Sequence, residues 1–387
     1  MYVMIISRGY PTDKYKMNGI FEFDQAKALA EAGHKVVFAA VDVRSIRRWR
    51  KWGIEKKKIE GVDVYAINIP GGRIPKAILQ KISSFGLNIL YRVIEKEQGK
   101  PEVMHAHFAG VGYTASKLHK RTQIPFVMTE HLSTMMKPVI DKRLFQIANE
   151  AYKSADALIA VSPGLKDVIK QRFNKNAICI PNIVDTKLFT YTPRKKDNIF
   201  RFVSIGSLKI GKRMDLTIEA FVRAFNDNDN VTLTIFGEGP ERPKLKKLIE
   251  KYQVEDKIKL MGLQSRKDIA EFLKKSDCFV LASQAETFGV VYIEALASGL
   301  PVIATKCGGP ECIVNERNGI FVPVDDLDAL IEAMRYMYQN INKYDRTLIA
   351  RETRETYSPS EIANKLNEVY QEVIAKAPNI NKVDNAK

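Results

Sequence analysis

Short, almost uninterrupted apolar segments alternate along this chain with longer segments in which apolar residues recur every three or four positions. The first kind is typical of strands buried on both faces of a parallel sheet, and the second of helices that cover such a sheet. The order strand, helix, strand appears at the first residues and returns in a second series after about residue 200. The pattern therefore predicts an α/β protein made of βαβ units.

The predicted elements fall into two series, which are separated by a polar stretch with one proline, residues 192–198. The strands predicted before this stretch are residues 2–7, 35–41, 62–68, 101–107, 126–129, 154–162 and 180–185, with helices at 20–32 and 75–97. The strands predicted after it are residues 202–208, 233–236, 258–261, 278–282, 302–304 and 321–323, and a last amphipathic helix covers 359–375.

A chain of 387 residues is longer than one hydrophobic core usually supports, so two domains are expected. The polar stretch is the predicted linker between them. We therefore assign residues 1–192 to an N-terminal Rossmann-like domain, residues 198–355 to a C-terminal Rossmann-like domain, and residues 356–387 to a terminal helix with a polar tail.

Composition and charge limit the kinds of partner that the protein is expected to bind and the compartment in which it is expected to work. The formal net charge of +16 favours anionic partners, which are nucleic acid, an anionic membrane face or phosphorylated substrates. No apolar run approaches the roughly 20 residues that cross a bilayer, and the opening apolar segment is too short for a signal peptide, so a cytoplasmic protein is expected. The four cysteines include no Cys-x-x-Cys pair, which argues against structural zinc.

Several candidate binding residues lie close together in residues 283–305, which follow one predicted strand and include the next. A helix is predicted to begin near Phe288 and Gly289, where unpaired backbone N–H groups and the positive end of the helix dipole favour a phosphate. Glu286 precedes these N–H groups, and Glu294 follows them inside the helix. Two carboxylates therefore flank a predicted diphosphate site at different depths.

These two glutamates are separated by seven residues, with Phe-Gly after the first and Glu-Ala-Leu-Ala-x-Gly-x-Pro-Val-Ile-Ala beginning at the second. This run resembles the signature of glycosyltransferase family 4, retaining enzymes that use sugar nucleotides. The resemblance implies the GT-B fold, in which two Rossmann-like doubly wound domains face each other across a cleft and the last helix crosses back to the first domain. It also implies that Glu286 binds donor-sugar hydroxyls, that the amides of Phe288, Gly289 and Val290 hold the diphosphate, and that Glu294 binds the ribose.

A second cationic group follows the strand at 202–208. Lys212 lies just past this strand, where a lysine can reach a phosphate as a point charge. Family members usually carry Gly-Arg-Leu in this strand, but Ser207 replaces the arginine, and Arg213 is the candidate to compensate. The resemblance also places two glycine turns beside the donor, one at Gly19 and one that contains Gly237 and Gly239.

Three histidines are predicted near one sheet edge. His105 and His107 point to the same side of their strand, and His131 follows the next strand. Such a group can suggest a metal, but no carboxylate-plus-histidine spacing accompanies it, so no metal is expected. The resemblance implies that His131 is an active-site residue against the donor sugar and that His107 lies on the acceptor side.

A basic run at residues 44–58 contains both tryptophans of the chain. Basic residues interleaved with tryptophan are typical of a membrane interface and also of single-stranded nucleic-acid sites, and a solvated loop is a third interpretation. The residues of this run assigned to the acceptor or the membrane are Arg47, Arg48, Trp49, Arg50 and Trp52.

The sequence as a whole predicts a hexosyl or other glycosyltransferase that moves a sugar from a nucleoside diphosphate sugar, with UDP expected rather than GDP and no metal cofactor. The expected acceptor is a lipid-linked or polysaccharide precursor of a cell-envelope glycan, reached by peripheral binding to the inner face of the membrane. Two alternatives stay open, which are a sugar-nucleotide epimerase of the same fold and a non-enzymatic protein that binds polyanions or membranes. No RNA- or DNA-binding motif is present, so nucleic acid is not an expected partner.

Overall fold

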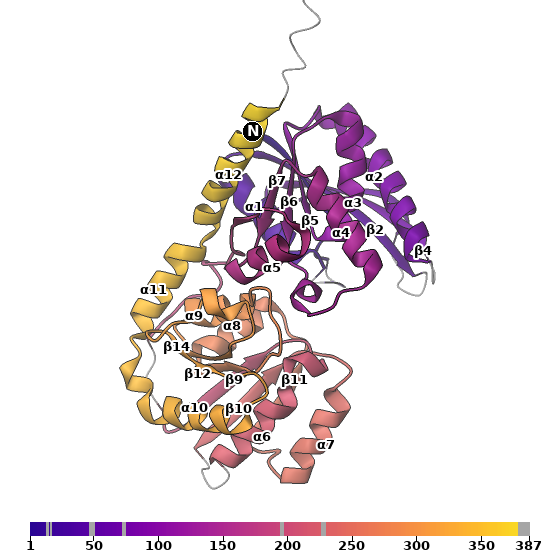
Figure 1. Cartoon of the computed structure of the whole chain (residues 1–387). Coiled ribbons are helices and arrows are strands. Elements are labelled where there is room, and N and C mark those ends of the chain that lie inside the picture. Colours follow the sequence, from indigo (N-terminus) through magenta and orange to yellow (C-terminus); the bar gives the residue numbers. More distant parts are fainter. Residues whose placement is uncertain are drawn as a thin grey trace, which may run out of the picture. The chain divides into compact units, whose positions relative to one another are not determined.

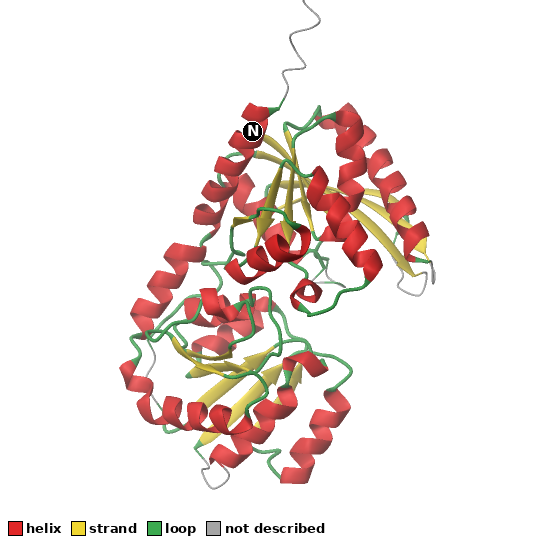
Figure 2. Cartoon of the chain, viewed as in Figure 1, coloured by secondary structure: helices red, strands yellow, loops and turns green. Residues whose placement is uncertain are grey.

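The computed structural model describes residues 1–12, 15, 18–45, 51–71, 75–193, 197–225 and 230–377. The chain divides into two compact units. Unit 1 contains residues 1–161, 166–181 and the chain from residue 359 onward, and unit 2 contains residues 162–165 and 182–358. Each unit is an α/β structure in which helices pack on a sheet (Figures 1 and 2).

The sheet of unit 1 has eight strands in the order β3-β4-β2-β1-β5-β6-β7-β8, parallel except for β3. The strands are β1 (Tyr2–Ser7), β2 (Lys35–Ser45), β3 (Gly53–Ile59), β4 (Val62–Gly71), β5 (Val103–His107), β6 (Phe126–Glu130), β7 (Ala157–Ala160) and β8 (Ile178–Cys179). The helices are α1 (Ile20–Glu31), α2 (Lys76–Gln98), α3 (Ala109–Thr122), α4 (Lys142–Ser154), α5 (Pro163–Phe173), most of which belongs to unit 1, and α12 (Pro359–Lys376), with a 3-10 turn η1 (Ser133–Met136).

Helix α12 belongs to unit 1 although it is the last helix of the chain (Figure 1). It packs against α1, and its apolar stripe, which includes Leu366, Tyr370 and Val373, is buried. The central strands β1, β5 and β6 are buried along their whole length, as expected for parallel strands covered on both faces.

The sheet of unit 2 has six parallel strands in the order β11-β10-β9-β12-β13-β14. They are β9 (Phe200–Ile205), β10 (Val231–Phe236), β11 (Ile258–Gly262), β12 (Cys278–Leu281), β13 (Val302–Thr305) and β14 (Gly319–Val322). The helices are α6 (Met214–Phe225), α7 (Arg242–Tyr252), α8 (Arg266–Lys274), α9 (Val290–Ala297), α10 (Leu327–Asn340) and α11 (Arg346–Tyr357), with 3-10 turns η2 (Ile210–Lys212), η3 (Pro310–Cys312) and η4 (Ile341–Lys343).

Both sheets contain a topological switch point. In unit 2 the chain proceeds from β9 to one side of the sheet and then returns to build the other side from β12, and in unit 1 the same reversal separates β1 from β5. Ligands of open parallel sheets bind outside the carboxyl ends of the strands at such a point.

One local prediction was wrong. No strand covers 180–185, because the edge strand β8 ends at Cys179 and Pro181 has no N–H to continue a ladder after Ile180 bonds to Ala160 (3.1 Å). One strand was not predicted, because residues 53–59 of the basic run form β3, an antiparallel edge strand on β4. Its lysines are exposed, which suits an edge that must not pair with other chains.

Candidate active site

The switch point of unit 2 brings together a lysine and a glutamate from two neighbouring strands. Lys212 follows β9 and Glu286 follows β12, and these two strands pair directly. The ammonium of Lys212 forms an ion pair with Oε1 of Glu286, which also accepts a hydrogen bond from the Ser283 hydroxyl at 2.7 Å. The lysine side chain is 24% exposed and the glutamate side chain 9%, so this charge pair lies at the edge of the unit's interior.

Backbone hydrogen bonds join the loops that carry this pair. The amide of Gln284 donates to the carbonyl of Gly211 at 2.8 Å, and the amide of Glu286 donates to the carbonyl of Cys307 at 3.3 Å. The loops after β9, β12 and β13 are thereby fixed to one another. The strand ends that carry these loops therefore determine where Lys212 and Glu286 lie.

Helix α9 begins beside the pair, close to the predicted position. Its N-cap is Gly289, whose φ of +94° lies in the left-handed region that favours glycine. Among the described residues no side chain caps this terminus, which leaves the first N–H groups of a helix starting at Val290 available to an anion. The Phe288 ring is buried and packs edge-on against Tyr357, so Phe288 anchors the loop that precedes α9.

Glu294 lies one turn inside α9 and pairs with a residue that the sequence analysis missed. Nη2 of Arg266 lies 3.1 Å from Oε1 of Glu294, and both side chains are almost buried. Arg266 is the first residue of α8, and its guanidinium also lies over the Phe189 ring at 5.5 Å. Ser265, which accepts a hydrogen bond from the Asp268 amide at 3.2 Å, signals the helix start in the sequence, but nothing in the sequence directs Arg266 toward Glu294.

The other donor-site candidates of unit 2 lie around the same strand ends. Arg213 has a φ of +48° and pairs with Asp325 and, at 3.2 Å, with Asp215, so its charge is already balanced by two carboxylates. Gly237 and Gly239 are required by packing, because a Cβ there would lie 1.8 Å from the Gly206 carbonyl oxygen and 2.2 Å from the Leu208 carbonyl oxygen.

The switch point of unit 1 contains Gly19, His107 and His131. Gly19 caps α1 with a φ of +68°, and a Cβ there would lie 2.1 Å from the Gly9 carbonyl oxygen. Nδ1 of His107 lies 3.0 Å from Nε2 of His131. The fully buried carboxylate of Glu130 accepts the His131 amide at 2.8 Å and thereby fixes the loop that carries this imidazole.

Burial keeps the imidazoles of His105 and His107 neutral. The pKa of His107 is held well below its usual value by burial and by the neighbouring histidines, and that of His105 is lowered to about 3 by burial and by His131. The ring nitrogens of His105 lie 2.6 Å from the Tyr370 hydroxyl and 2.7 Å from the Thr129 hydroxyl. Within the described part of the chain, no three potential ligand residues are grouped so that they could hold a metal ion.

The predicted acceptor or membrane residues Arg47, Arg48, Trp49 and Arg50 lie outside the described residues, and Trp52 is half-buried. No described helix is both long and apolar enough to span a bilayer.

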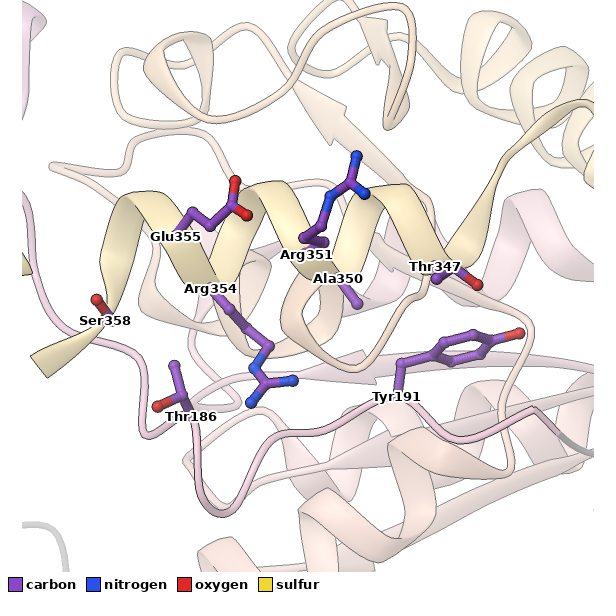
Figure 3. A pocket seen from close by; sticks show the side chains of 8 residues that line it. All are labelled: Thr186, Tyr191, Thr347, Ala350, Arg351, Arg354, Glu355 and Ser358. Atoms are coloured by element: carbon purple, nitrogen blue, oxygen red, sulfur yellow. The ribbon is translucent and has the colours of Figure 1, made fainter.

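A separate hollow of about 430 Å³ lies beside α11 in unit 2 (Figure 3). It is lined by Thr186, Tyr191, Ser358 and residues of α11, which include Arg351, Arg354 and Glu355. In Figure 3 the side chains of Arg351 and Glu355 project from the helix in another direction than that of Arg354. None of the donor-site candidates lines this hollow.

Two protein-family models match the chain. The one described as "Glycosyl transferases group 1" covers residues 186–353, and the one described as "Glycosyltransferase Family 4" covers residues 23–188. Together they account for most of both units.

Curated relatives and solved structures agree with these matches. The glycogen synthase of Mycobacterium tuberculosis is 26% identical over 61% of this chain, and the chain spans only 60% of that relative. The alpha-monoglucosyldiacylglycerol synthase of Acholeplasma laidlawii is 28% identical over 74% of this chain and 78% of the relative.

Sucrose-phosphate synthase of Thermosynechococcus elongatus has a TM-score of 0.78 at 20% identity, covering 97% of this chain and 99% of that chain. The structure of Anabaena HepE in complex with UDP-glucose has a TM-score of 0.73 at 16% identity, covering 96% of this chain and 100% of that chain. These structures show the fold, and the predicted class of two parallel-sheet α/β domains of the GT-B type is confirmed.

Proposed function

The chain belongs to the glycosyltransferases described by these two family models, and from this we propose that it transfers a sugar from a nucleoside diphosphate sugar with retention of anomeric configuration. The observation that carries the proposal is the Lys212–Glu286 pair at the switch point of unit 2. In the free protein each charge neutralises the other, which offsets the desolvation cost of keeping both side chains largely buried.

Donor binding exchanges the partners of this pair. The diphosphate takes Lys212 as its counterion, and Glu286, still held by Ser283, becomes free to accept hydrogen bonds from the sugar hydroxyls. The charge that develops on the leaving diphosphate is stabilised by Lys212 and by the N–H groups at the start of α9. Glu294, oriented by Arg266, binds the ribose.

We propose His131 of unit 1 as a further active-site residue. Glu130 holds it through its backbone amide at 2.8 Å, and Nδ1 of the neutral His107 lies 3.0 Å from its Nε2. Because His107 resists protonation, it acts as a hydrogen-bonding group rather than as a cation.

The proposed donor nucleotide, acceptor and membrane binding rest on the relatives and on the net charge of the chain. HepE, of similar fold, binds UDP-glucose, which supports a UDP-sugar donor. The relative named alpha-monoglucosyldiacylglycerol synthase supports a lipid-linked acceptor, and the net charge of +16 supports peripheral binding to an anionic membrane from the cytoplasmic side, in envelope glycan synthesis. No metal is needed in this proposal, because Lys212 and the helix amides meet the charge of the diphosphate.

The test begins with thermal-shift measurements on a panel of nucleotide sugars, since a ligand of the folded state raises apparent stability. The chosen donor is then used to measure release of free nucleotide by the wild type, Lys212→Ala and Glu286→Gln. We expect each variant to lose at least about tenfold in turnover.

Lys274→Ala and Glu271→Gln are matched controls, because they break a Lys–Glu pair (2.7 Å) on α8 in which the lysine is as exposed as Lys212 but the glutamate is 56% exposed. Near-normal turnover in a folded Glu286→Gln protein would contradict the assignment. Formation of an epimeric sugar nucleotide from the donor alone would instead identify the protein as an epimerase.

A further inference from the structure

Two charged residues at the carboxyl edge of the unit 2 sheet have a left-handed backbone. Arg213, which follows Lys212 in the loop after β9, has a φ of +48°, and Asp325, in the loop after β14, has a φ of +60°. A residue with a Cβ is strained in this region and stays there only when its surroundings hold it. Such residues gather at functional sites, so the contacts that hold these two indicate what they do.

Arg213 and Asp325 hold each other, and a third loop joins them. Nη1 of Arg213 forms an ion pair with Oδ1 of Asp325, and Nε2 of Gln284, in the loop after β12, donates to Oδ2 of Asp325 at 2.8 Å. Nε of Arg213 also lies 3.2 Å from Oδ1 of Asp215, in the first turn of α6. The two carboxylate oxygens of Asp325 therefore bind two different loops. We call Arg213, Gln284 and Asp325 the Asp325 clamp.

The Asp325 clamp connects strand ends that are not neighbours in the sheet. Strand β14 is an edge strand, and β12 and β13 separate it from β9. Arg213 is the residue after Lys212, and Gln284 lies two positions before Glu286. Asp325 therefore ties the two loops that carry the Lys212–Glu286 pair to each other and to the loop at the edge of the sheet.

Stability does not explain the clamp. The side chains of Arg213 and Asp325 are 20% and 43% exposed, so water and salt screen their ion pair and it contributes little to folding. Two strained backbone conformations oppose this small gain. Direct binding of the diphosphate does not explain the clamp either, because Asp215 and Asp325 already face the Arg213 guanidinium and would repel an anion there.

We propose that Asp325 is a positioning residue of the sugar transfer, which acts through Arg213 and Gln284 on the loops that carry Lys212 and Glu286; this rests on the proposed function. In the proposed exchange the donor takes Lys212 from Glu286, which removes the side-chain link between these loops. The clamp uses neither of these two residues, so it still holds the loops together when the diphosphate leaves.

The clamp should therefore act on turnover rather than on donor affinity. A displacement of about 1 Å at a catalytic site can cost about 100-fold in rate. The contacts proposed for the ribose at Glu294 and for the diphosphate at the start of α9 lie outside the clamp, and they hold the donor whether or not the clamp is intact. Loss of the clamp should thus lower kcat and leave KM nearly unchanged.

The test breaks the clamp without adding strain. Asp325→Gly and Arg213→Gly each delete the ion pair and put glycine at a left-handed position, which glycine adopts readily. Asp325→Asn keeps an acceptor and tolerates the left-handed region but lacks the charge. Gln253→Gly is the matched control, because Gln253 ends α7 in unit 2 with a φ of +56° and belongs to none of the proposed contacts.

The measurements are kcat and KM with the donor selected from the nucleotide-sugar panel, UDP affinity by calorimetry, and Tm. We expect Asp325→Gly and Arg213→Gly each to lose about tenfold in kcat, while UDP affinity changes less than about twofold and Tm does not fall. Asp325→Asn should lie between Asp325→Gly and the wild type. The double variant should lose no more than Asp325→Gly alone, because both substitutions break one contact. Gln253→Gly should keep wild-type turnover.

The alternatives give different results. If Arg213 binds the diphosphate itself, Arg213→Gly weakens UDP binding while Asp325→Gly, which frees the guanidinium, strengthens it, and the inference is wrong. Wild-type kcat in a folded Asp325→Gly protein, or losses that multiply in the double variant, would also overturn it. Absence of transfer by the wild type would contradict the proposed function and with it this inference, whereas normal turnover of Asp325→Gly beside an active wild type contradicts the inference alone.

Discussion

Replacing Lys212 by alanine separates the catalytic role of the Lys212–Glu286 pair from its contribution to folding. Breaking a fully buried ion pair by removing one partner costs about 3–5 kcal/mol. Lys212, however, is 24% exposed, and Glu286 keeps its hydrogen bond from Ser283. We therefore expect Lys212→Ala to lower the free energy of unfolding by about 1–2 kcal/mol, which corresponds to about 2–8 °C in Tm.

The effect on turnover should be larger than the effect on stability. Loss of one preorganised charge-stabilising group typically costs about 100- to 1,000-fold in kcat, because the group acts where charge develops in the transition state. The double variant Lys212→Ala/Glu286→Gln completes a thermodynamic cycle. If the pair exists in the free protein, the two changes in stability fall short of additivity by about 1 kcal/mol.

The assay is nucleotide release from the preferred donor, with thermal unfolding of all four cycle proteins measured in the same buffer. The exposed pair Lys274–Glu271 supplies a second cycle as a control, for which we expect less than about 0.5 kcal/mol of coupling. Turnover of Lys212→Ala within threefold of wild type, or strictly additive stability changes at Lys212 and Glu286, would refute the reasoning.

Four further outcomes are expected. Glu294→Ala and Arg266→Ala should each raise the donor KM about tenfold with kcat nearly unchanged, since a ribose contact is made in ground and transition states alike; unchanged UDP affinity by calorimetry would remove both from the site. Activity should survive EDTA, and loss that Mn²⁺ restores would show that a metal is required. Because burial lowers the pKa of His105, its protonation in the unfolded state should reduce stability as the pH falls below about 6.5, by up to about 1.4 kcal/mol per pH unit, and His105→Gln should make this dependence less steep in thermal unfolding. Flotation with phosphatidylglycerol vesicles at low salt should require the cations and tryptophans of residues 47–52, at about 1 kcal/mol per cation, and binding that survives their replacement by serine and alanine would exclude this run.

The sequence predicts the fold class because parallel strands covered on both faces are short apolar runs, and such runs mark nearly every strand of both sheets. It also predicts the start of α9 to within two residues, since Gly289 takes a conformation that few other residues adopt. Strand β3 was missed because three consecutive lysines separate Glu55 from Ile59, so the segment shows no apolar–polar alternation and most of its residues are exposed. Periodicity alone does not distinguish such a strand from a solvated loop.

The pairings of the site residues are harder to predict, because they depend on contacts between distant segments. Arg266 and Glu294 belong to different helices, and the partner of His105 is Tyr370, 265 positions away on a helix that packs back onto unit 1. A local pattern specifies where such a helix begins or ends. It does not specify which side chain the helix brings to a strand end.

The same distinction separates the donor segment from the polar residues of unit 1. Five donor-site candidates, which are Glu286, Phe288, Gly289, Val290 and Glu294, lie in one continuous segment, 283–294, so their spacing alone carries a recognisable signature. Asp42 and Asn68 lie in different strands, and only the register of β2 on β4 places them opposite each other. A one-residue change in that register would turn Asn68 to the opposite face of the sheet, while every residue of the donor segment stayed in place. Contacts of this kind follow from strand pairing, and no search for a sequence motif would find them.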